Sequence, residues 1–374
     1  MGIVSLCCLA FGTAAAMLYE DTNVRESQPW VPHIIAGNIA LEQGRYAEAA
    51  LSYEEAFTEI PQDRAHELAR AHALNGLGVA YSRLGKYPAA GKLLQEALTI
   101  RRKSLGDRHP EVAAVWNNIG TVHYRQGRYR EALRCYRSAL AIDEAAFGAS
   151  SAAVANDLNN VASASLETRQ YSFAERTLRR AIDIGRSLAS PDKRLPEFLK
   201  NLACVLGRQR QFNEAKALDE QVLTMQQRDR GARHPSVGLT LEHLATMELG
   251  LNRCSVAQRH AQESVFILNA TLGEEHPRSA SANYVLARAY ECMKQRDLAE
   301  KTMQHVVEID ARAPGSADER SLYFRTYARL LRSANRKTEA KRYEDLGSKM
   351  EAEARRAAQH GVVVDVMELQ SERR

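Results

Sequence analysis

The sequence has few of the residues that interrupt helices or build compact metal sites. Only 6% of the 374 residues are aromatic, ten are proline, and no two cysteines have C-x-x-C spacing. Most prolines and glycines fall between helical patterns, where they act as breaks. With 45% hydrophobic and 26% charged residues, the chain is predicted to be folded and all-helical.

The missing C-x-x-C pair argues against a zinc site or a dithiol redox motif. Cys7 and Cys8 are adjacent, whereas the other four cysteines are far apart. These four are Cys135, Cys204, Cys254 and Cys292. We interpret them as buried free thiols, because an unpaired cysteine commonly behaves as a small hydrophobic residue.

Motifs for catalysis and nucleotide binding are also incomplete. His66 and Glu67 begin an H-E-x-x-H-like stretch, but Arg70 occupies the position of the second histidine. The stretch 78–86 ends in Gly-Lys like a phosphate-binding loop, but Tyr87 stands where serine or threonine would bind magnesium. We therefore predict that the protein is not an enzyme and uses no cofactor, metal ion or small-molecule substrate.

The charge balance gives little support for a nucleic-acid partner. The net charge is +5, and basic groups such as 101–103 and 179–180 lie close to acidic residues in the same predicted helices. A solvated helix face explains this arrangement better than a basic stripe. A nucleic-acid-binding solenoid is therefore the lowest-ranked alternative.

The first 28 residues form a separate segment. Residues 3–18 are an uncharged run of 16, slightly short for a membrane span, and Ala14 to Ala16 resemble a signal-peptide cleavage site. No lysine or arginine precedes this run. A cleaved signal peptide, a membrane anchor, and a capping helix or misplaced start codon all remain open. The protein is expected to be exported in the first case, and membrane-anchored or cytoplasmic otherwise.

A repeat is the strongest signal in the chain. The G-R-Y-x-E-A stretch of residues 44–49 recurs at 127–132, and a related copy occupies 85–90. The last alanine of each copy marks eight units, and we call these residues the marker alanines. They are Ala49, Ala90, Ala132, Ala174, Ala215, Ala257, Ala299 and Ala340. Their spacing of 41 or 42 residues predicts an array of eight similar structural units.

Each unit contains two helical patterns, clearest in the third copy. The first stripe consists of Val112, Val115, Trp116, Ile119 and Val122, and the second of Tyr129, Ala132, Leu133, Tyr136, Ala139 and Leu140. Both have the spacing of a helix face. Between them Gly127 is expected to adopt a left-handed conformation that ends the first helix. Such a hairpin cannot bury its apolar residues alone, which predicts that the hairpins stack.

The linkers between units also repeat. Three of them end in His-Pro, at residues 109–110, 234–235 and 276–277. Proline is favoured at the first position of a helix, since the amide hydrogen that it lacks would have no partner there. The three histidines are therefore interpreted as linker residues, not as catalysts.

The third copy reads Trp116-x2-Ile119-Gly120-x6-Gly127-x4-Ala132-x3-Tyr136-x2-Ala139. This pattern resembles the tetratricopeptide repeat, and the 42-residue period is similar to the longer variant of kinesin light chains. The resemblance covers roughly residues 30–356. It implies a right-handed superhelical solenoid of about eight helical hairpins, with first helices on the concave side and second helices on the convex side.

These observations divide the chain into a leader or anchor segment (1–28), an eight-repeat solenoid (29–356) and a C-terminal tail (357–374). Residues 362–369 of the tail are apolar and β-prone. They are interpreted as a frayed end or a strand against the last helix; the alternative is an internal pseudo-ligand lying in the groove.

Asparagines recur at one place in the repeat. Fourteen residues before the marker alanines of the third to fifth copies lie Asn118, Asn160 and Asn201, and Asn75, Asn117 and Asn159 occupy the preceding position in the second to fourth copies. We call these six residues the asparagine ladder. Seven residues before the marker alanines of the second, third and fifth copies lie Arg83, Arg125 and Arg208, and the fourth copy has Glu167 at this position.

An asparagine both donates and accepts hydrogen bonds, as a peptide backbone does. We therefore predict that the ladder and the three arginines bind a protein or peptide in the concave groove, with a preference for an acidic one. The alternative for the asparagines is structural, because they can bond across to the adjacent repeat. The alternative for the whole protein is an assembly scaffold bound through its convex face or its ends.

Overall fold

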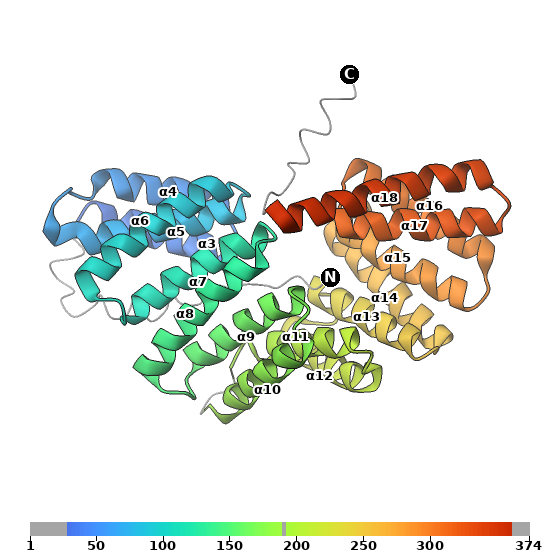
Figure 1. Ribbon diagram of the computed structural model, residues 1–374, viewed down its shortest axis with the longest axis horizontal. Coiled ribbons are helices and arrows are strands. Elements are labelled where there is room, and N and C mark those ends of the chain that lie inside the picture. Colours follow the sequence, from blue (N-terminus) through green and yellow to red (C-terminus); the bar gives the residue numbers. More distant parts are fainter. Residues whose placement is uncertain (1–27, 189–191, 361–374) are drawn as a thin grey trace, which may run out of the picture. The chain divides into compact units, whose positions relative to one another are not determined.

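The computed structural model describes residues 28–188 and 192–360, and this part of the chain is helical without any strand (Figure 1). The predicted all-α solenoid of helical hairpins is confirmed. The helices form two compact units that divide at Asp192 and Lys193. The segment interpreted as a signal peptide, a membrane anchor or a capping helix and most of the tail, residues 1–27 and 361–374, lie outside the described residues.

The N-terminal unit contains four hairpins. Its helices are α3 (Trp30–Glu42), α4 (Tyr46–Glu59), α5 (Glu67–Arg83), α6 (Tyr87–Leu105), α7 (Pro110–Arg125), α8 (Tyr129–Phe147), α9 (Ala152–Glu167) and α10 (Tyr171–Ser187), with a short 3₁₀ turn at Arg64–His66. The C-terminal unit also contains four. Its helices are α11 (Leu195–Arg208), α12 (Phe212–Arg230), α13 (Pro235–Gly250), α14 (Cys254–Leu272), α15 (Pro277–Cys292), α16 (Arg296–Arg312), α17 (Ala317–Ser333) and α18 (Lys337–His360).

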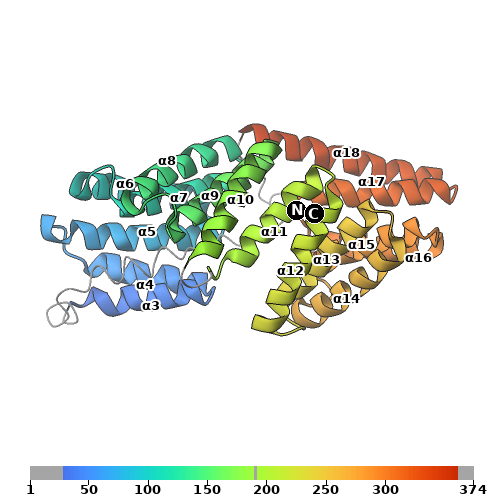
Figure 2. The same ribbon diagram turned by 90° about the horizontal axis from the view of Figure 1, so that it is seen from below.

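Within each unit the hairpins stack side by side (Figure 2). The two helices of a hairpin pack against each other, and the second helix then packs on the first helix of the next hairpin. Successive first helices also contact one another, as α3, α5, α7 and α9 do in the N-terminal unit and α13 and α15 in the C-terminal unit. The first helices therefore form one continuous layer in the N-terminal unit.

The turn inside every hairpin has the same backbone conformation. Gly127 has a φ of +73°, as predicted, and Gly44 and Gly85 are also left-handed. In the last five copies the equivalent residue is not glycine but keeps a positive φ of 59° to 64°. These residues are Arg169, Arg210, Asn252, Lys294 and Asn335. A left-handed non-glycine residue costs about 1 to 2 kcal/mol, so the packing of the hairpin must offset this strain.

Small residues allow the helices to approach closely. All eight marker alanines are completely buried. At Gly120 an added Cβ atom would lie 2.6 Å from the ring of Tyr136, which leaves no room for a side chain. The predicted apolar stripe of the third copy is confirmed, with Trp116 partly buried against the cluster formed by α5 to α8.

The His-Pro linkers cap the helices that follow them. The ring Nδ1 atoms of His109, His234 and His276 each accept a hydrogen bond from the backbone N–H two residues further on, at 3.0 to 3.2 Å. Burial lowers the pKa of His234 and His276, which favours the neutral ring that can accept this bond. The interpretation of these histidines as linker residues is confirmed.

The interpretation of all four separated cysteines as free thiols is wrong for two of them. Cys254 and Cys292 form a disulfide with a Cα–Cα distance of 5.6 Å, whereas Cys135 and Cys204 are free. Cys254 begins α14 and Cys292 ends α15. Stacking places the start of one hairpin's second helix beside the end of the next first helix, so residues 38 apart in sequence become neighbours.

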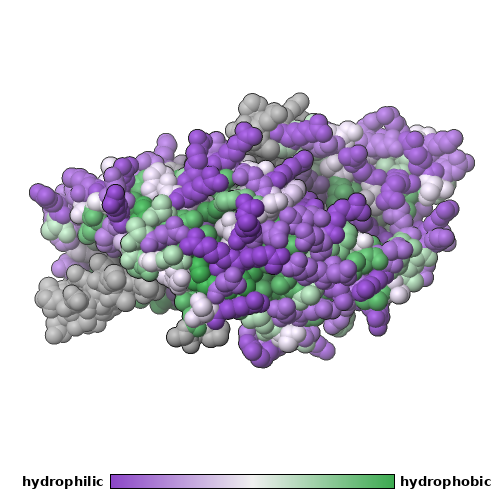
Figure 3. All heavy atoms as spheres, turned by 60° about the horizontal axis from the view of Figure 1, so that its bottom comes forward, coloured by the Kyte–Doolittle hydropathy of each residue, from purple (hydrophilic) through white to green (hydrophobic). Residues whose placement is uncertain are grey.

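The face of the molecule drawn in Figure 3 is mainly polar. Hydrophilic residues cover most of this face, and hydrophobic residues form separate strips between them. None of the helices that the structure describes is both long enough and apolar enough to span a bilayer.

Candidate interaction site on the first helices

The asparagine ladder lies on the first helices, as the repeat predicts, but most of it is buried. Asn75 is on α5, Asn117 and Asn118 on α7, and Asn159 and Asn160 on α9 of the N-terminal unit. Asn201 is on α11 of the C-terminal unit. All except Asn117 are at most 9% exposed.

The amides of the N-terminal unit bond to one another across adjacent hairpins. Asn118 Nδ2 donates to Asn75 Oδ1 at 2.8 Å, and Asn160 Nδ2 donates to Asn117 Oδ1 at 3.4 Å. Asn117 Nδ2 in turn donates to Asp157 Oδ1 at 2.6 Å. These bonds connect α5, α7 and α9, so the amides hold neighbouring first helices in register.

A buried carboxylic acid pair lies beside this network. Asp143 of α8 and Asp157 of α9 are 7% and 1% exposed, and the two side chains are hydrogen bonded. Burial raises the pKa of Asp143 from 3.8 to about 6, although the bond to Asp157 opposes this shift. Since this bond lowers the pKa of Asp143, it favours the ionised Asp143 carboxylate as the acceptor, and one proton shared between the two carboxyl groups lets the pair occupy a buried site.

This raised pKa makes the stability dependent on pH. The folded protein binds the Asp143 proton more tightly than the unfolded chain, so its stabilising contribution is complete below pH 3.8 and is lost as the pH rises through about 6. We expect the difference in free energy of unfolding between Asp143→Asn and wild type to shift by about 2 kcal/mol in favour of the variant when the pH is raised from 4.5 to 7.5. Urea unfolding at both pH values measures the difference. A difference that is the same at both would contradict the assignment.

The three arginines predicted to bind the ligand with the ladder occupy different environments. Arg83 and Arg125 end α5 and α7 and are partly buried, and the Arg83 guanidinium lies 5.7 Å from the centre of the Tyr46 ring. Arg208 ends α11 in the C-terminal unit and is exposed. The structure therefore places Arg83 and Arg125 on neighbouring first helices of one unit and Arg208 on the other unit.

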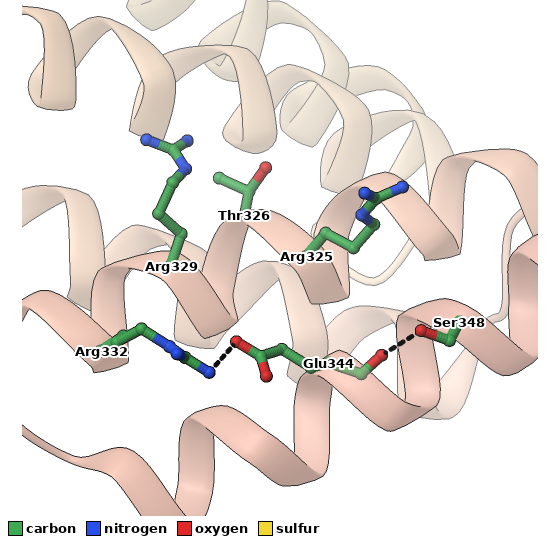
Figure 4. A pocket seen from close by; sticks show the side chains of 6 residues that line it. All are labelled: Arg325, Thr326, Arg329, Arg332, Glu344 and Ser348. Carbon is green, nitrogen blue, oxygen red and sulfur yellow. Dashed lines mark hydrogen bonds and ion pairs between the residues drawn. The ribbon is translucent and has the colours of Figure 1, made fainter.

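The sequence reasoning missed an arginine-lined cavity of about 600 Å³ between α17 and α18 (Figure 4). Arg325, Arg329 and Arg332 of α17 line it and are 58% to 63% exposed. The other lining residues are Thr326, Glu344 and Ser348. The arginines form ion pairs with Glu351, Glu291 and Glu344, respectively. Exposed ion pairs contribute only about 0 to 1 kcal/mol each, so an incoming anion can compete for these guanidinium groups.

Two residues of this cavity stand at the same repeat positions as asparagines of the ladder. Thr326 lies fourteen residues before Ala340, and Asn118 lies fourteen residues before Ala132. Arg325 corresponds in the same way to Asn117. Counting back from the last marker alanine therefore places Arg325 and Thr326, but not the rest of the cavity, at ladder positions of the eighth copy.

Comparison with known families is consistent with this geometry. The tetratricopeptide repeat profile matches residues 69–145, 111–187 and 196–270, which together span more than half of the chain, and a second profile of the same repeat matches 280–312. The chain belongs to the tetratricopeptide repeat family. This family consists in general of protein-interaction modules.

Several solved structures are similar to this chain at low identity. The putative kinesin light chain repeats of Podosopora anserina share 22% identity, covering 55% of this chain and 98% of that one with a TM-score of 0.48. BtubC from P. vanneervenii shares 18%, covering 65% and 94% with a TM-score of 0.47. Aspartyl phosphate phosphatase F from Bacillus subtilis shares 14%, covering 91% and 97% with a TM-score of 0.52. No curated protein matches the sequence.

Proposed function

We propose that this tetratricopeptide repeat protein is a non-catalytic module that binds an acidic peptide, or an acidic segment of a protein, on the face formed by its first helices. The arginine cavity of the C-terminal unit is the main binding site in this proposal. The N-terminal unit offers separate contacts on its own first helices, at Asn117, Arg83 and Arg125, whereas Arg208 lies on a first helix of the unit that holds the cavity.

The observation that carries the proposal is the arginine-lined cavity. Three guanidinium groups project from a single helix, at Arg325, Arg329 and Arg332, and more than half of each side chain is exposed. A guanidinium has five N–H donors, so each arginine can bond a ligand carboxylate while it retains its glutamate partner. The acidic class of ligand follows from this excess of donors.

The role of the ladder amides is narrower than a direct grip on the ligand. Asn118 and Asn160 donate to amides of the preceding hairpin and are buried. Asn117 is the most accessible of the six, and it connects α7 to α9. In this proposal the amides set the spacing of the first helices, and accessible groups such as that of Asn117 bond to the ligand.

The proposal is tested by titrating the protein with a fluorescein-labelled octaglutamate peptide and following its anisotropy. We expect Arg325→Gln/Arg329→Gln to weaken binding at least tenfold, because a hydrogen bond to a charged group contributes about 1.5 to 3 kcal/mol. The matched control is Arg130→Gln/Arg134→Gln on the second helix α8, where both arginines are exposed and Arg134 pairs with Glu131. This control should bind the peptide like wild type.

The same titration distinguishes the alternatives. Equal losses in the control and in Arg325→Gln/Arg329→Gln would point to general charge attraction and contradict a site in the cavity. An octalysine peptide should not bind. Asn160→Ala should weaken binding by about 1 kcal/mol if the ladder reaches the ligand. If Asn160→Ala lowers only the melting temperature, the amides serve the joint between hairpins. Absence of any octaglutamate binding would favour a scaffold bound through its other surfaces.

A further inference from the structure

Three reactive side chains from three successive helices meet in the C-terminal unit. Cys204 Sγ on α11 lies 3.7 Å from His243 Nε2 on α13, and His243 Nδ1 lies 2.5 Å from Asp219 Oδ2 on α12. Asp219 is completely buried, whereas the His243 side chain is 21% exposed and Cys204 is partly exposed. A thiol, an imidazole and a carboxylate in this order form the arrangement that activates a cysteine nucleophile.

The charges in this cluster favour an ionised sulfur. Burial and the charge of Asp219 raise the pKa of the Cys204 thiol, but the neighbouring His243, helped by Lys200, lowers it below the ordinary value. Burial would likewise lower the pKa of His243, but Asp219 and Cys204 raise it well above its ordinary value. Both shifts favour a thiolate beside an imidazolium, and the contact with Asp219 Oδ2 orients the His243 ring toward the sulfur.

The other free cysteine in the described chain has the opposite environment. Cys135 of α8 is buried in the apolar cluster of α5 to α8, and burial raises the pKa of its thiol to about 11. The charged side chains that act on its pKa are Arg134 and Glu131, and no histidine is among them. Cys135 is therefore a built-in reference for the chemistry expected at Cys204.

A metal ion does not explain the cluster. Among residues 28–188 and 192–360, no three histidine, cysteine or acidic side chains are arranged to hold one. Repeated hydrolysis of a substrate is not favoured either. Cys204 lies in the interior of α11, where its backbone N–H bonds within the helix and cannot stabilise an oxyanion. The geometry suits a single covalent step at sulfur.

We propose that Cys204 is a modification site, where a thiolate activated by His243 and Asp219 exchanges with a low-molecular-weight disulfide. The Cys204 sulfur attacks one sulfur of the disulfide R–S–S–R, a new S–S bond forms, and the original S–S bond breaks. The leaving thiolate takes the proton from His243 Nε2 and departs as R–SH. Cys204 is oxidised to the mixed disulfide and the departing half is reduced, so electrons balance.

The test measures the rate of modification at each cysteine of the full-length protein. The protein is treated with bis(2-hydroxyethyl) disulfide between pH 5 and 9, quenched with acid, digested and mapped by mass spectrometry. At pH 6 we expect Cys204 to react about 10- to 100-fold faster than free cysteine, because a much larger fraction of it is thiolate. Cys135 should remain almost unmodified. Cys204→Ser should abolish the corresponding adduct.

Two variants separate activation from mere accessibility. His243→Gln should reduce the rate at pH 6 at least tenfold and shift its pH dependence toward that of an ordinary thiol, and Asp219→Asn should have an intermediate effect. If either variant loosens the fold, Cys135 will also become reactive, which reveals the artefact. In that case the pKa of His243, measured by NMR in wild type and in Cys204→Ser, still tests the interaction between His243 and Cys204. The proposal is overturned if wild-type Cys204 reacts no faster than free cysteine at pH 6, or if His243→Gln leaves its rate unchanged while Cys135 stays protected. The result is independent of peptide binding, because only sulfur chemistry is measured.

Discussion

Tyr136→Ala is expected to lower the free energy of unfolding by about 3 to 5 kcal/mol, as for other large aromatic side chains removed from a core. Tyr136 is completely buried in α8, and its ring lies directly over Gly120 of α7. It also belongs to a cluster that includes Val161 and Ala164 of α9. The ring therefore fills space within the third hairpin and between the third and fourth. Chemical denaturation followed by circular dichroism measures the loss.

Tyr136→Phe is the matched control for this prediction. The hydroxyl of Tyr136 bonds to Thr121 at 3.4 Å, a long contact that should contribute little. We therefore expect the phenylalanine variant to remain within about 1 kcal/mol of wild type, the contribution of a typical hydrogen bond. If both variants lose the same amount, the hydroxyl rather than the ring would be the important group, and our account of the packing would be wrong.

Loss of the disulfide between Cys254 and Cys292 is expected to have a similarly large effect. The bond links residues 38 apart, and closing a loop of this length stabilises the folded state by about 4 kcal/mol in the chain-entropy description. We expect Cys254→Ser/Cys292→Ser to unfold at a correspondingly lower denaturant concentration. Wild type treated with dithiothreitol should behave like the double variant.

Cys135→Ser provides a comparison, since that thiol is free and buried. It tests whether loss of any cysteine has the same effect. The assignment of the disulfide fails if mass spectrometry of the unreduced protein finds both Cys254 and Cys292 as free thiols, or if dithiothreitol does not change the stability of wild type.

Much of the fold could be predicted because many of the repeats share residue types at their helix starts, turns and close contacts. A small residue, the marker alanine, stands at the same place in every copy. Gly127 permits a left-handed turn, and proline begins the helices of the His-Pro linkers. These are short-range effects of side-chain size and backbone freedom. They specify helices and turns without knowledge of what lies elsewhere in the chain.

The candidate site was harder to predict, because it depends on the direction in which side chains point as well as on their position in the repeat. The repeat placed Asn118 and Asn160 on the first helices, but not the partners toward which their amides turn. Asn75 and Asn117, one hairpin earlier, receive these bonds. The arginine cavity was missed because the ladder position of the eighth copy holds Thr326 instead of an asparagine.

The sequence by itself determined the helical hairpin, its period of 41 to 42 residues and the layer to which each residue belongs, because these properties follow from helix periodicity and from small residues at fixed places. Only the tertiary structure decided the disulfide, the buried Asp143–Asp157 pair and the meeting of Cys204, Asp219 and His243. Each of these joins side chains from different helices. The physical reason is that a contact between neighbouring helices depends on their rotation and offset when they stack, and a linear pattern does not contain those quantities.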